Sequence, residues 1–120
     1  MKKLRILIVE DDVMARMALE MILTEVAPVA VIVHRTVRGA ASILREKFDF
    51  AFLNTEVADG ETFGLAYALA ARGVPFAFMT DRDRDELPRA WISHPLLSKP
   101  PRRAAVRRAL LHAEDYPLVA

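Results

Sequence analysis

The feature that most constrains the fold of this chain is a set of four short apolar runs that each end at a polar residue. The runs cover residues 4–9, 50–53, 76–79 and 96–98, and each has the length of a strand buried on both faces. Parallel strands in an α/β sheet bring their carboxyl ends to one edge. We therefore expect a single pocket formed by the polar residues after the runs, which are Glu10, Asp11, Asn54, Thr80 and Lys99.

The segments between these runs carry apolar residues at helical spacing. They predict five helices, over about residues 12–26, 36–47, 62–72, 87–93 and 100–112, and a β-branched strand over residues 29–33. Five strands that alternate with five helices favour a doubly wound, five-stranded parallel sheet of the α/β class. We expect the first helix to turn its methionines toward the core, namely Met14, Met17 and Met21.

Length and composition narrow the class of protein further. A chain of 120 residues is expected to form a single domain, residues 1–120, with no fused output domain. The absence of cysteine excludes disulfides and thiolate metal sites, and a net charge of +1 makes nucleic-acid binding unlikely to be its role. Because no apolar stretch approaches membrane-spanning length, we expect a soluble, cytoplasmic protein.

The polar set has the composition that phosphoryl transfer to a side chain requires. Glu10 and Asp11 could hold Mg²⁺, Lys99 could bind a phosphoryl oxygen, and the hydroxyl of Thr80 could donate to another. Taken singly, these residues are also ordinary helix caps, strand ends or surface lysines, and only the set in register favours a site. The reaction needs a carboxylate nucleophile, and the position that should supply it holds Asn54.

Four motifs stand in register along the chain: Leu7–Asp12, Asp49–Asn54, Phe76–Thr80 and Leu97–Pro100. Over essentially its whole length the chain thereby resembles the receiver domains of bacterial two-component response regulators. Two further stretches, Asp59–Phe63 and Leu69–Phe76, are similar to the stand-alone receivers of alphaproteobacteria. The resemblance implies a flavodoxin-like receiver fold and a role in a phosphorelay.

Carried over position by position, the resemblance implies a role for each residue of the pocket. Glu10 and Asp11 would be the acidic pair, with Asp11 as the direct metal ligand, and the backbone carbonyl of Glu56 would be the third protein ligand of Mg²⁺. Thr80 would be the switch hydroxyl and Lys99 the phosphoryl-binding lysine. The resemblance implies that the fifth strand and last helix face a histidine kinase, a histidine phosphotransferase or a dimer mate.

Asn54 falls on the phosphoacceptor position and is the main departure from the family. An amide nitrogen is a poor nucleophile, so Asn54 cannot form an acyl phosphate. Leu96 stands where the family has a switching Tyr or Phe, Pro101 replaces the usual Phe, and Asp81 replaces Gly or Ala. Pro100 keeps the family pattern, which implies a cis peptide bond before it.

Asn54 has three interpretations. It can be native in a degenerate receiver, an engineered replacement that locks the unphosphorylated state, or a residue that deamidates slowly to aspartate. We favour the first, because Leu96 and Pro101 are also unusual. The leading hypothesis is a pseudo-receiver, meaning a receiver-like domain that acts by protein–protein interaction without accepting phosphate. The alternative is a functional phosphoacceptor, with the phosphoryl group on deamidated Asn54, Asp11 or Glu56.

Two expectations follow for the charged residues. Without a carboxylate at position 54, Lys99 should pair with Asp11, and Mg²⁺ should bind weakly at most. Four arginines cluster at the start of the last helix, and they fit a solvated face as well as a partner surface. A homodimer through the fifth strand and this helix is one form that such a surface could take. The arginines are Arg102, Arg103, Arg107 and Arg108.

Overall fold

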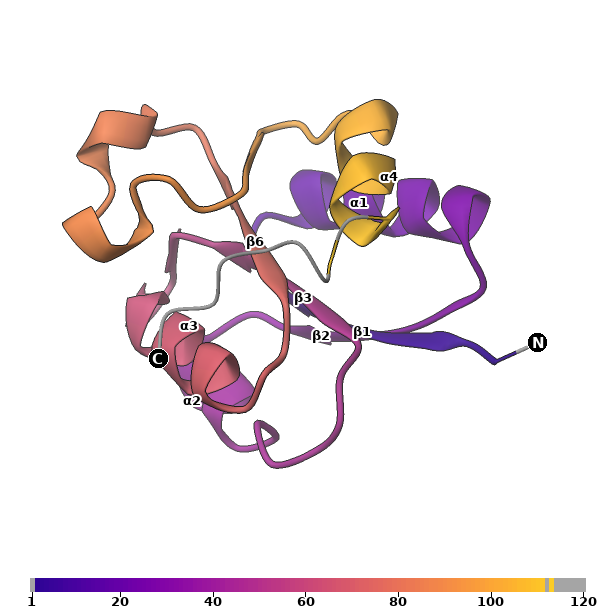
Figure 1. Cartoon of the computed structure of the whole chain (residues 1–120), viewed down its shortest axis with the longest axis horizontal. Helices are drawn as coiled ribbons and strands as arrows, with labels where there is room; N and C mark the ends of the chain where they lie inside the picture. The colour runs from indigo at the N-terminus through magenta and orange to yellow at the C-terminus, as the bar shows by residue number, and fades with distance from the viewer. Residues whose placement is uncertain (1, 112, 114–120) are drawn as a thin grey trace.

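A central parallel sheet organises the computed structural model, which describes residues 2–111 and residue 113 (Figure 1). Its strands are β1 (Leu4–Val9), β2 (Val29–His34), β3 (Phe50–Asn54), β6 (Phe76–Thr80) and β7 (Leu96–Ser98). They lie in the order β2-β1-β3-β6-β7, and every neighbouring pair is parallel. The order reverses direction after β1, so the predicted doubly wound α/β fold is confirmed.

Helices cover both faces of the sheet, which explains why the central strands are apolar without alternation. On one face lie α1 (Val13–Val26) and α4 (Arg103–Leu111), and on the other lie α2 (Val37–Ala41) and α3 (Phe63–Ala71) (Figure 1). Every residue of β3 and β6 is buried. Their side chains alternate between the two cores, so that Phe52 packs beneath α1 and α4 while Leu53 packs toward α3.

The helix caps follow the sequence signals. Asp12 accepts hydrogen bonds from the backbone N–H groups of Met14 and Ala15, and Thr36 accepts one from Gly39. Gly73 follows α3 with φ +73°, a left-handed conformation that ends the helix at little steric cost. The second helix is shorter than predicted, because α2 ends at Ala41 and turns follow it. The predicted last helix reached His112, which lies outside the described residues.

The prediction of a helix over residues 87–93 is wrong. Two 3₁₀ turns, η1 (Arg84–Glu86) and η2 (Arg89–Trp91), connect β6 to β7, so the described residues contain four α-helices. Leu87 separates the turns with ψ 153°. The residue before a proline is disfavoured in the helical region, and Pro88 therefore breaks the segment at this point.

A two-stranded hairpin follows β3 and was not predicted. Strand β4 (Glu56–Val57) pairs antiparallel with β5 (Gly60–Glu61), where the sequence indicated only a turn. Gly60 adopts φ +138°, which an L residue rarely adopts. The hairpin places its acidic side chains beside the carboxyl end of the sheet.

The expectation that the methionines of the first helix face the core is also wrong. Met14, Met17 and Met21 are 78%, 51% and 64% exposed, whereas the buried side of α1 is formed by Ala15, Leu19 and Leu23. Both sets recur at helical spacing, so periodicity alone could not choose between them. The helix therefore carries an apolar stripe that faces solvent.

The connection between β6 and β7 is held by an aromatic cluster. Trp91 is fully buried and its ring lies 5.4 Å from that of Phe76, 5.7 Å from that of Phe78 and 4.8 Å from that of Tyr67. The His94 ring stacks on Phe76 at 4.3 Å and hydrogen bonds to its carbonyl oxygen at 2.8 Å. A buried anchor of this size substitutes for the missing helix in fixing the connection.

The arginines of α4 remain on the surface. Arg103 donates to the Glu25 carboxylate of α1 at 2.5 Å, while Arg107 and Arg108 are exposed and form no ion pair within the described part of the chain. The homodimer through this face stays a prediction. No helix among the described residues is long and apolar enough to cross a lipid bilayer.

Candidate functional site

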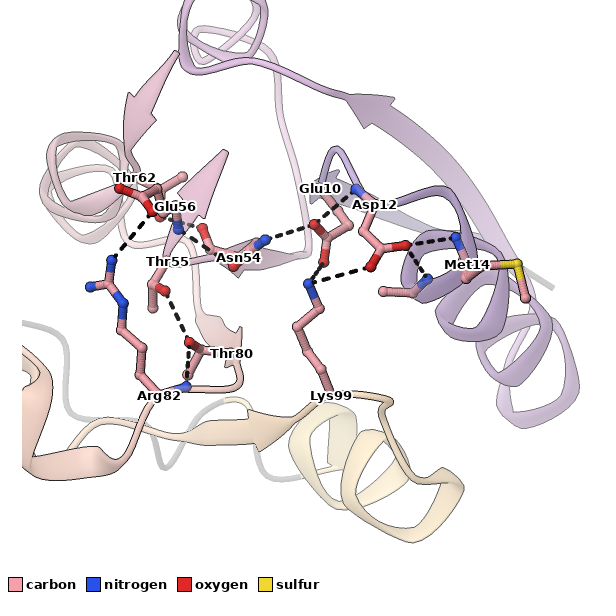
Figure 2. A network of polar contacts seen from close by, with 11 residues as sticks. Glu10, Asp12, Met14, Asn54, Thr55, Glu56, Thr62, Thr80, Arg82 and Lys99 are labelled. Atoms are coloured by element: carbon pink, nitrogen blue, oxygen red, sulfur yellow. Dashed lines mark hydrogen bonds and ion pairs between the residues drawn. The ribbon is translucent and has the colours of Figure 1, made fainter. Parts of the chain in front are cut away.

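The predicted pocket residues converge at the carboxyl edge of the sheet (Figure 2). Glu10 follows β1, Asn54 ends β3, Thr80 ends β6 and Lys99 follows β7. Glu10 is fully buried, Asn54 and Thr80 are 9% and 4% exposed, and the Lys99 side chain is 14% exposed. Such burial of polar groups is costly unless each has a partner, so the contacts decide what this site can do.

Glu10 is the centre of the polar network. Its Oε2 accepts a hydrogen bond of 2.7 Å from Asn54 Nδ2 and one of 3.2 Å from the backbone N–H of Asp12. Its Oε1 accepts no aligned hydrogen bond, but it lies 3.1 Å from Lys99 Nζ as an ion pair. Both oxygens of the buried carboxylate are therefore occupied by groups of the chain itself.

The predicted pairing of Lys99 with Asp11 is wrong. Lys99 Nζ lies closest to Glu10 and is 4.0 Å from Asp12 Oδ2. Asp11 is half-buried, and its side chain makes no hydrogen bond or ion pair with any described residue. A fully buried carboxylate needs a counter-charge more than a half-exposed one does, which explains the choice of partner.

The orientation of the Asn54 amide follows from its neighbours. Nδ2 faces the Glu10 carboxylate as a donor, whereas the flipped amide would set two acceptor oxygens against each other. Asn54 Oδ1 accepts a long contact of 3.4 Å from the backbone N–H of Glu56. The backbone carbonyl of Asn54 accepts a hydrogen bond of 2.7 Å from the hydroxyl of Thr62, the N-cap residue of α3. The amide is thus held from several directions.

The Thr80 hydroxyl is paired inside the pocket. Its Oγ1 lies 3.0 Å from Thr55 Oγ1 and accepts the backbone N–H of Arg82 at 3.0 Å. Thr55 is 1% exposed. Thr55 was not predicted as a site residue, although its place directly after the buried strand that ends at Asn54 could have suggested it.

Arg82 was also missed, and it joins two loops at the rim of the pocket. Its guanidinium lies 3.7 Å from Glu56 Oε1 (Figure 2). It also lies 3.6 Å from Glu61 Oε2. It thereby links the connection after β6 to the β4–β5 hairpin. The Glu56 side chain is 63% exposed and serves this bridge, while the metal-ligand role predicted for its backbone carbonyl stays a prediction.

The far end of the hairpin is tied to α2. Asp59 Oδ1 accepts the backbone N–H of Val37 at 2.6 Å, and Oδ2 accepts that of Arg38 at 3.0 Å. These two hydrogen bonds stabilise the charged carboxylate and lower the pKa of Asp59 below its ordinary value. The bond from Val37 has the larger effect on the pKa, and the bond from Arg38 the next largest. The hairpin is therefore held at its strands by Arg82 and at its turn by the start of α2.

The buried carboxylate of the donor set is not free to bind a divalent cation. No group of three His, Cys, Asp or Glu side chains in the described part of the chain is arranged to hold a metal ion. Both Glu10 oxygens already contact Asn54, Asp12 and Lys99, so Mg²⁺ could use Glu10 only by displacing one of these. The half-buried Asp11 carboxylate, by contrast, has no such contact with a described residue. The ammonium of Lys99 supplies positive charge where a cation would otherwise be needed.

The surroundings of the pocket match other details of the sequence prediction. The Lys99–Pro100 peptide bond is cis, as the resemblance implied.

A cleft of about 380 Å³ opens next to Lys99, between the start of α1 and the loop after β7. It is lined by Asp12, Met14, Ala15, Ala18, Asp81, Lys99 and Pro100. The exposed stripe of α1 and the pocket therefore meet at one opening.

Comparison with known proteins gives the family. No protein-family model and no curated protein matches the chain. Among solved structures, SdrG from Sphingomonas melonis Fr1 is 34% identical, covers 95% of this chain and 99% of its own, and has a TM-score of 0.77. The BeF₃-activated conformation of SdrG from Pseudomonas melonis Fr1 is 35% identical, covers 92% of this chain and 97% of its own, and has a TM-score of 0.74.

A CheY-like response regulator receiver domain from Methylobacillus flagellatus shares the fold at a TM-score of 0.79. It is 18% identical over 93% of this chain and 99% of its own. A sheet of this order with acid, Thr and Lys at its carboxyl edge defines the receiver class. The chain belongs to the receiver domains of two-component response regulators, a class that interacts with histidine kinases and phosphotransferases.

Proposed function

We propose that this chain is a pseudo-receiver, which binds a histidine kinase or a histidine phosphotransferase without accepting a phosphoryl group. The observation that carries the proposal is the contact between Asn54 Nδ2 and Glu10 Oε2 at 2.7 Å. A phosphoacceptor must present a nucleophilic oxygen to the incoming phosphorus. Here the residue in that place presents a hydrogen-bond donor to a buried carboxylate instead.

The charge balance of the pocket supports the same function. The buried carboxylate of Glu10 is neutralised by Lys99, and Asn54 adds no charge. An aspartate at position 54 would add a second buried negative charge close to Glu10, and that pair would call for a divalent cation. The buried part of the pocket, formed by Glu10, Asn54 and Lys99, is therefore balanced in charge without a metal ion. We propose that Mg²⁺ binds it weakly at most.

The switching parts also support a receiver that does not respond to phosphate. The hydroxyl of Thr80 is paired with Thr55, and Leu96 brings no aromatic ring that could swing between exposed and buried positions. Trp91 is buried in the aromatic cluster next to β6. In this proposal the domain offers one fixed surface to its partner rather than two alternating ones.

The outer face of α1 is the surface that we propose for the partner. Val13, Met14, Met17 and Met21 are exposed there, and Met14 also lines the cleft beside Lys99. Exposed apolar side chains in a contiguous stripe mark protein–protein contacts, and methionine adapts well to an irregular partner.

The alternative function is that of an active phosphoacceptor. Thr80 and Lys99 do lie together at the carboxyl edge of the sheet, which favours it. It requires that Asn54 be an engineered replacement or deamidate to aspartate, or that Asp11 or Glu56 take the phosphoryl group. No enzymatic aspartyl-phosphate chemistry is expected of the intact amide.

Intact mass spectrometry after incubation with acetyl phosphate and Mg²⁺ tests the proposal, with Asn54→Asp as the matched variant. We expect that only Asn54→Asp gains the mass of a phosphoryl group. A stable, acid-labile phosphate on the unaltered chain, with the amide of Asn54 intact, would refute the pseudo-receiver. A binding assay against purified histidine kinase dimerisation domains and phosphotransferases of the source organism tests the partner class.

A further inference from the structure

The methionines of α1 form one exposed stripe of thioethers. Met14, Met17 and Met21 stand three and four residues apart, so they lie on one side of the helix, and each is at least half exposed. Solvent-exposed methionine is the form that oxidants reach most readily.

The rest of the described chain offers little competing sulfur. The sequence contains five methionines and no cysteine. Met1 lies outside the described residues, and Met79 is fully buried in β6 beneath α1 and α4. Within the described residues, sulfur that can react with a soluble oxidant is therefore confined to the stripe.

We propose that this stripe is a modification site for peroxides, and that its oxidation releases the partner from α1. A sulfur lone pair attacks one peroxide oxygen, the O–O bond breaks, and the second oxygen leaves as water with both protons. The thioether becomes a sulfoxide through a two-electron oxidation, and the peroxide is reduced. The inference rests on the proposed function, because it assigns regulation to the same docking surface.

Oxidation should change binding and leave the fold intact. The buried side of α1 consists of other residues, Ala15, Leu19 and Leu23, so a sulfoxide on the stripe would lie off that side and remain accessible to water in the free protein. In a complex, three sulfoxides would be buried against an apolar partner without hydrogen-bond partners, which is unfavourable. The pocket contains no sulfur and keeps its Glu10–Lys99 pair.

The first measurement is the site of oxidation. The protein is treated with hydrogen peroxide, and peptide mass spectrometry follows the gain of oxygen at each methionine. We expect Met14, Met17 and Met21 to oxidise at least about tenfold faster than Met79. Thermal unfolding should be unchanged by the treatment. Oxidation of Met79 at the same rate as the stripe would overturn the assignment.

The second measurement is the effect on binding. The probe is the tightest binder from a panel of histidine kinase dimerisation domains and phosphotransferases of the source organism, titrated by calorimetry. We expect the Kd to rise about tenfold or more after peroxide and to return after treatment with methionine sulfoxide reductase. The triple variant Met14→Leu, Met17→Leu, Met21→Leu should bind the partner, and peroxide should leave its Kd unchanged. In the control variant Met79→Leu, peroxide should still raise the Kd.

The outcomes separate the two proposals. If no panel member binds the untreated protein, the docking function fails, and the regulatory inference fails with it. If a partner binds untreated and oxidised protein equally tightly, the docking function stands and the oxidation switch is refuted. Loss of binding in the triple leucine variant after peroxide would likewise refute the role of the stripe.

Discussion

The pocket and the outer face of α1 reverse the usual distribution of polar and apolar groups. In the pocket, the carboxylate of Glu10 and the amide of Asn54 are buried, and the side chain of Lys99 is mostly buried. Glu10 contacts Asn54 at 2.7 Å and Lys99 at 3.1 Å. On α1, by contrast, three apolar methionine side chains are at least half exposed to solvent. The polar region is closed by its own partners, while the apolar one is open to a partner from outside.

In the proposed function, this difference reflects a move of function from the pocket to the outer face of α1. A pocket that performs chemistry has to leave ligand positions free for metal and phosphate. A pocket whose groups satisfy one another contributes to stability and fixes the surrounding loops. Substitutions in the pocket should therefore mainly change folding, and substitutions on the α1 stripe should mainly change binding.

The largest expected effect comes from Lys99→Met. The substitution leaves the fully buried Glu10 carboxylate without its counter-charge, and it should cost about 3 kcal/mol of unfolding free energy. Urea unfolding measures it. The double variant Glu10→Gln, Lys99→Met should lose less than the single variant, since no uncompensated charge remains. Equal losses of unfolding free energy in the single and double variants would show that the Glu10–Lys99 ion pair does not stabilise the pocket.

Asn54→Asp should have the next largest effect. It replaces a donor to Glu10 with a second carboxylate, and it should cost about 2 kcal/mol in the absence of divalent ions. Addition of Mg²⁺ should recover most of that loss in the variant and leave the unaltered chain unchanged. Thermal unfolding with and without Mg²⁺ checks this. An equal Mg²⁺ response in both proteins would contradict a buried pocket that is balanced in charge without a metal ion.

Asp59→Asn should have a smaller effect on stability, which is present at neutral pH and disappears in acid. Its hydrogen bonds from Val37 and Arg38 lower the folded pKa below the ordinary value of 3.8. The stability that the carboxylate contributes is therefore present above pH 3.8 and is lost as the pH falls through the lowered folded pKa. Urea midpoints measured across this range should fall less steeply with acid in Asp59→Asn. An unchanged acid limb would mean that the hairpin is not tied to α2 in this way.

The smallest expected change in stability comes from the α1 stripe. Met17→Gln should alter the unfolding free energy by less than about 0.5 kcal/mol, because the side chain is half exposed and lies off the buried face. Leu19→Ala is the matched control on that buried face and should cost about 2–5 kcal/mol. Comparable losses in the two variants, measured by urea unfolding, would remove the contrast between the two sides of α1.

The sheet and the convergence of its polar ends could be predicted from the sequence. Runs such as Phe50–Asn54 are apolar on both faces, and parallel strands leave few other arrangements. The partner of Lys99 could not be predicted, because the choice between Glu10 and Asp11 depends on which carboxylate is buried. Contacts between distant loops, such as Arg82 with Glu61, likewise leave no periodic signal in the sequence.

Two further features could not be predicted from the sequence: which side of α1 faces the core, and the conformation of the connection between β6 and β7. The first helix is apolar on two sides, so the hydrophobic pattern did not distinguish Met17 from Leu19. In the connection, the extended conformation imposed before Pro88 outweighed helical propensity, and burial of Trp91 then fixed the resulting turns.

The most direct test of the central claim is a calorimetric titration of Mg²⁺ into the unaltered chain and into Asn54→Asp. If the Asn54 amide and Lys99 occupy the Glu10 carboxylate, the aspartate variant should bind Mg²⁺ at least about tenfold more tightly than the unaltered chain. Equal affinities in the two proteins would contradict the claim that the buried part of this pocket is balanced in charge without a metal ion.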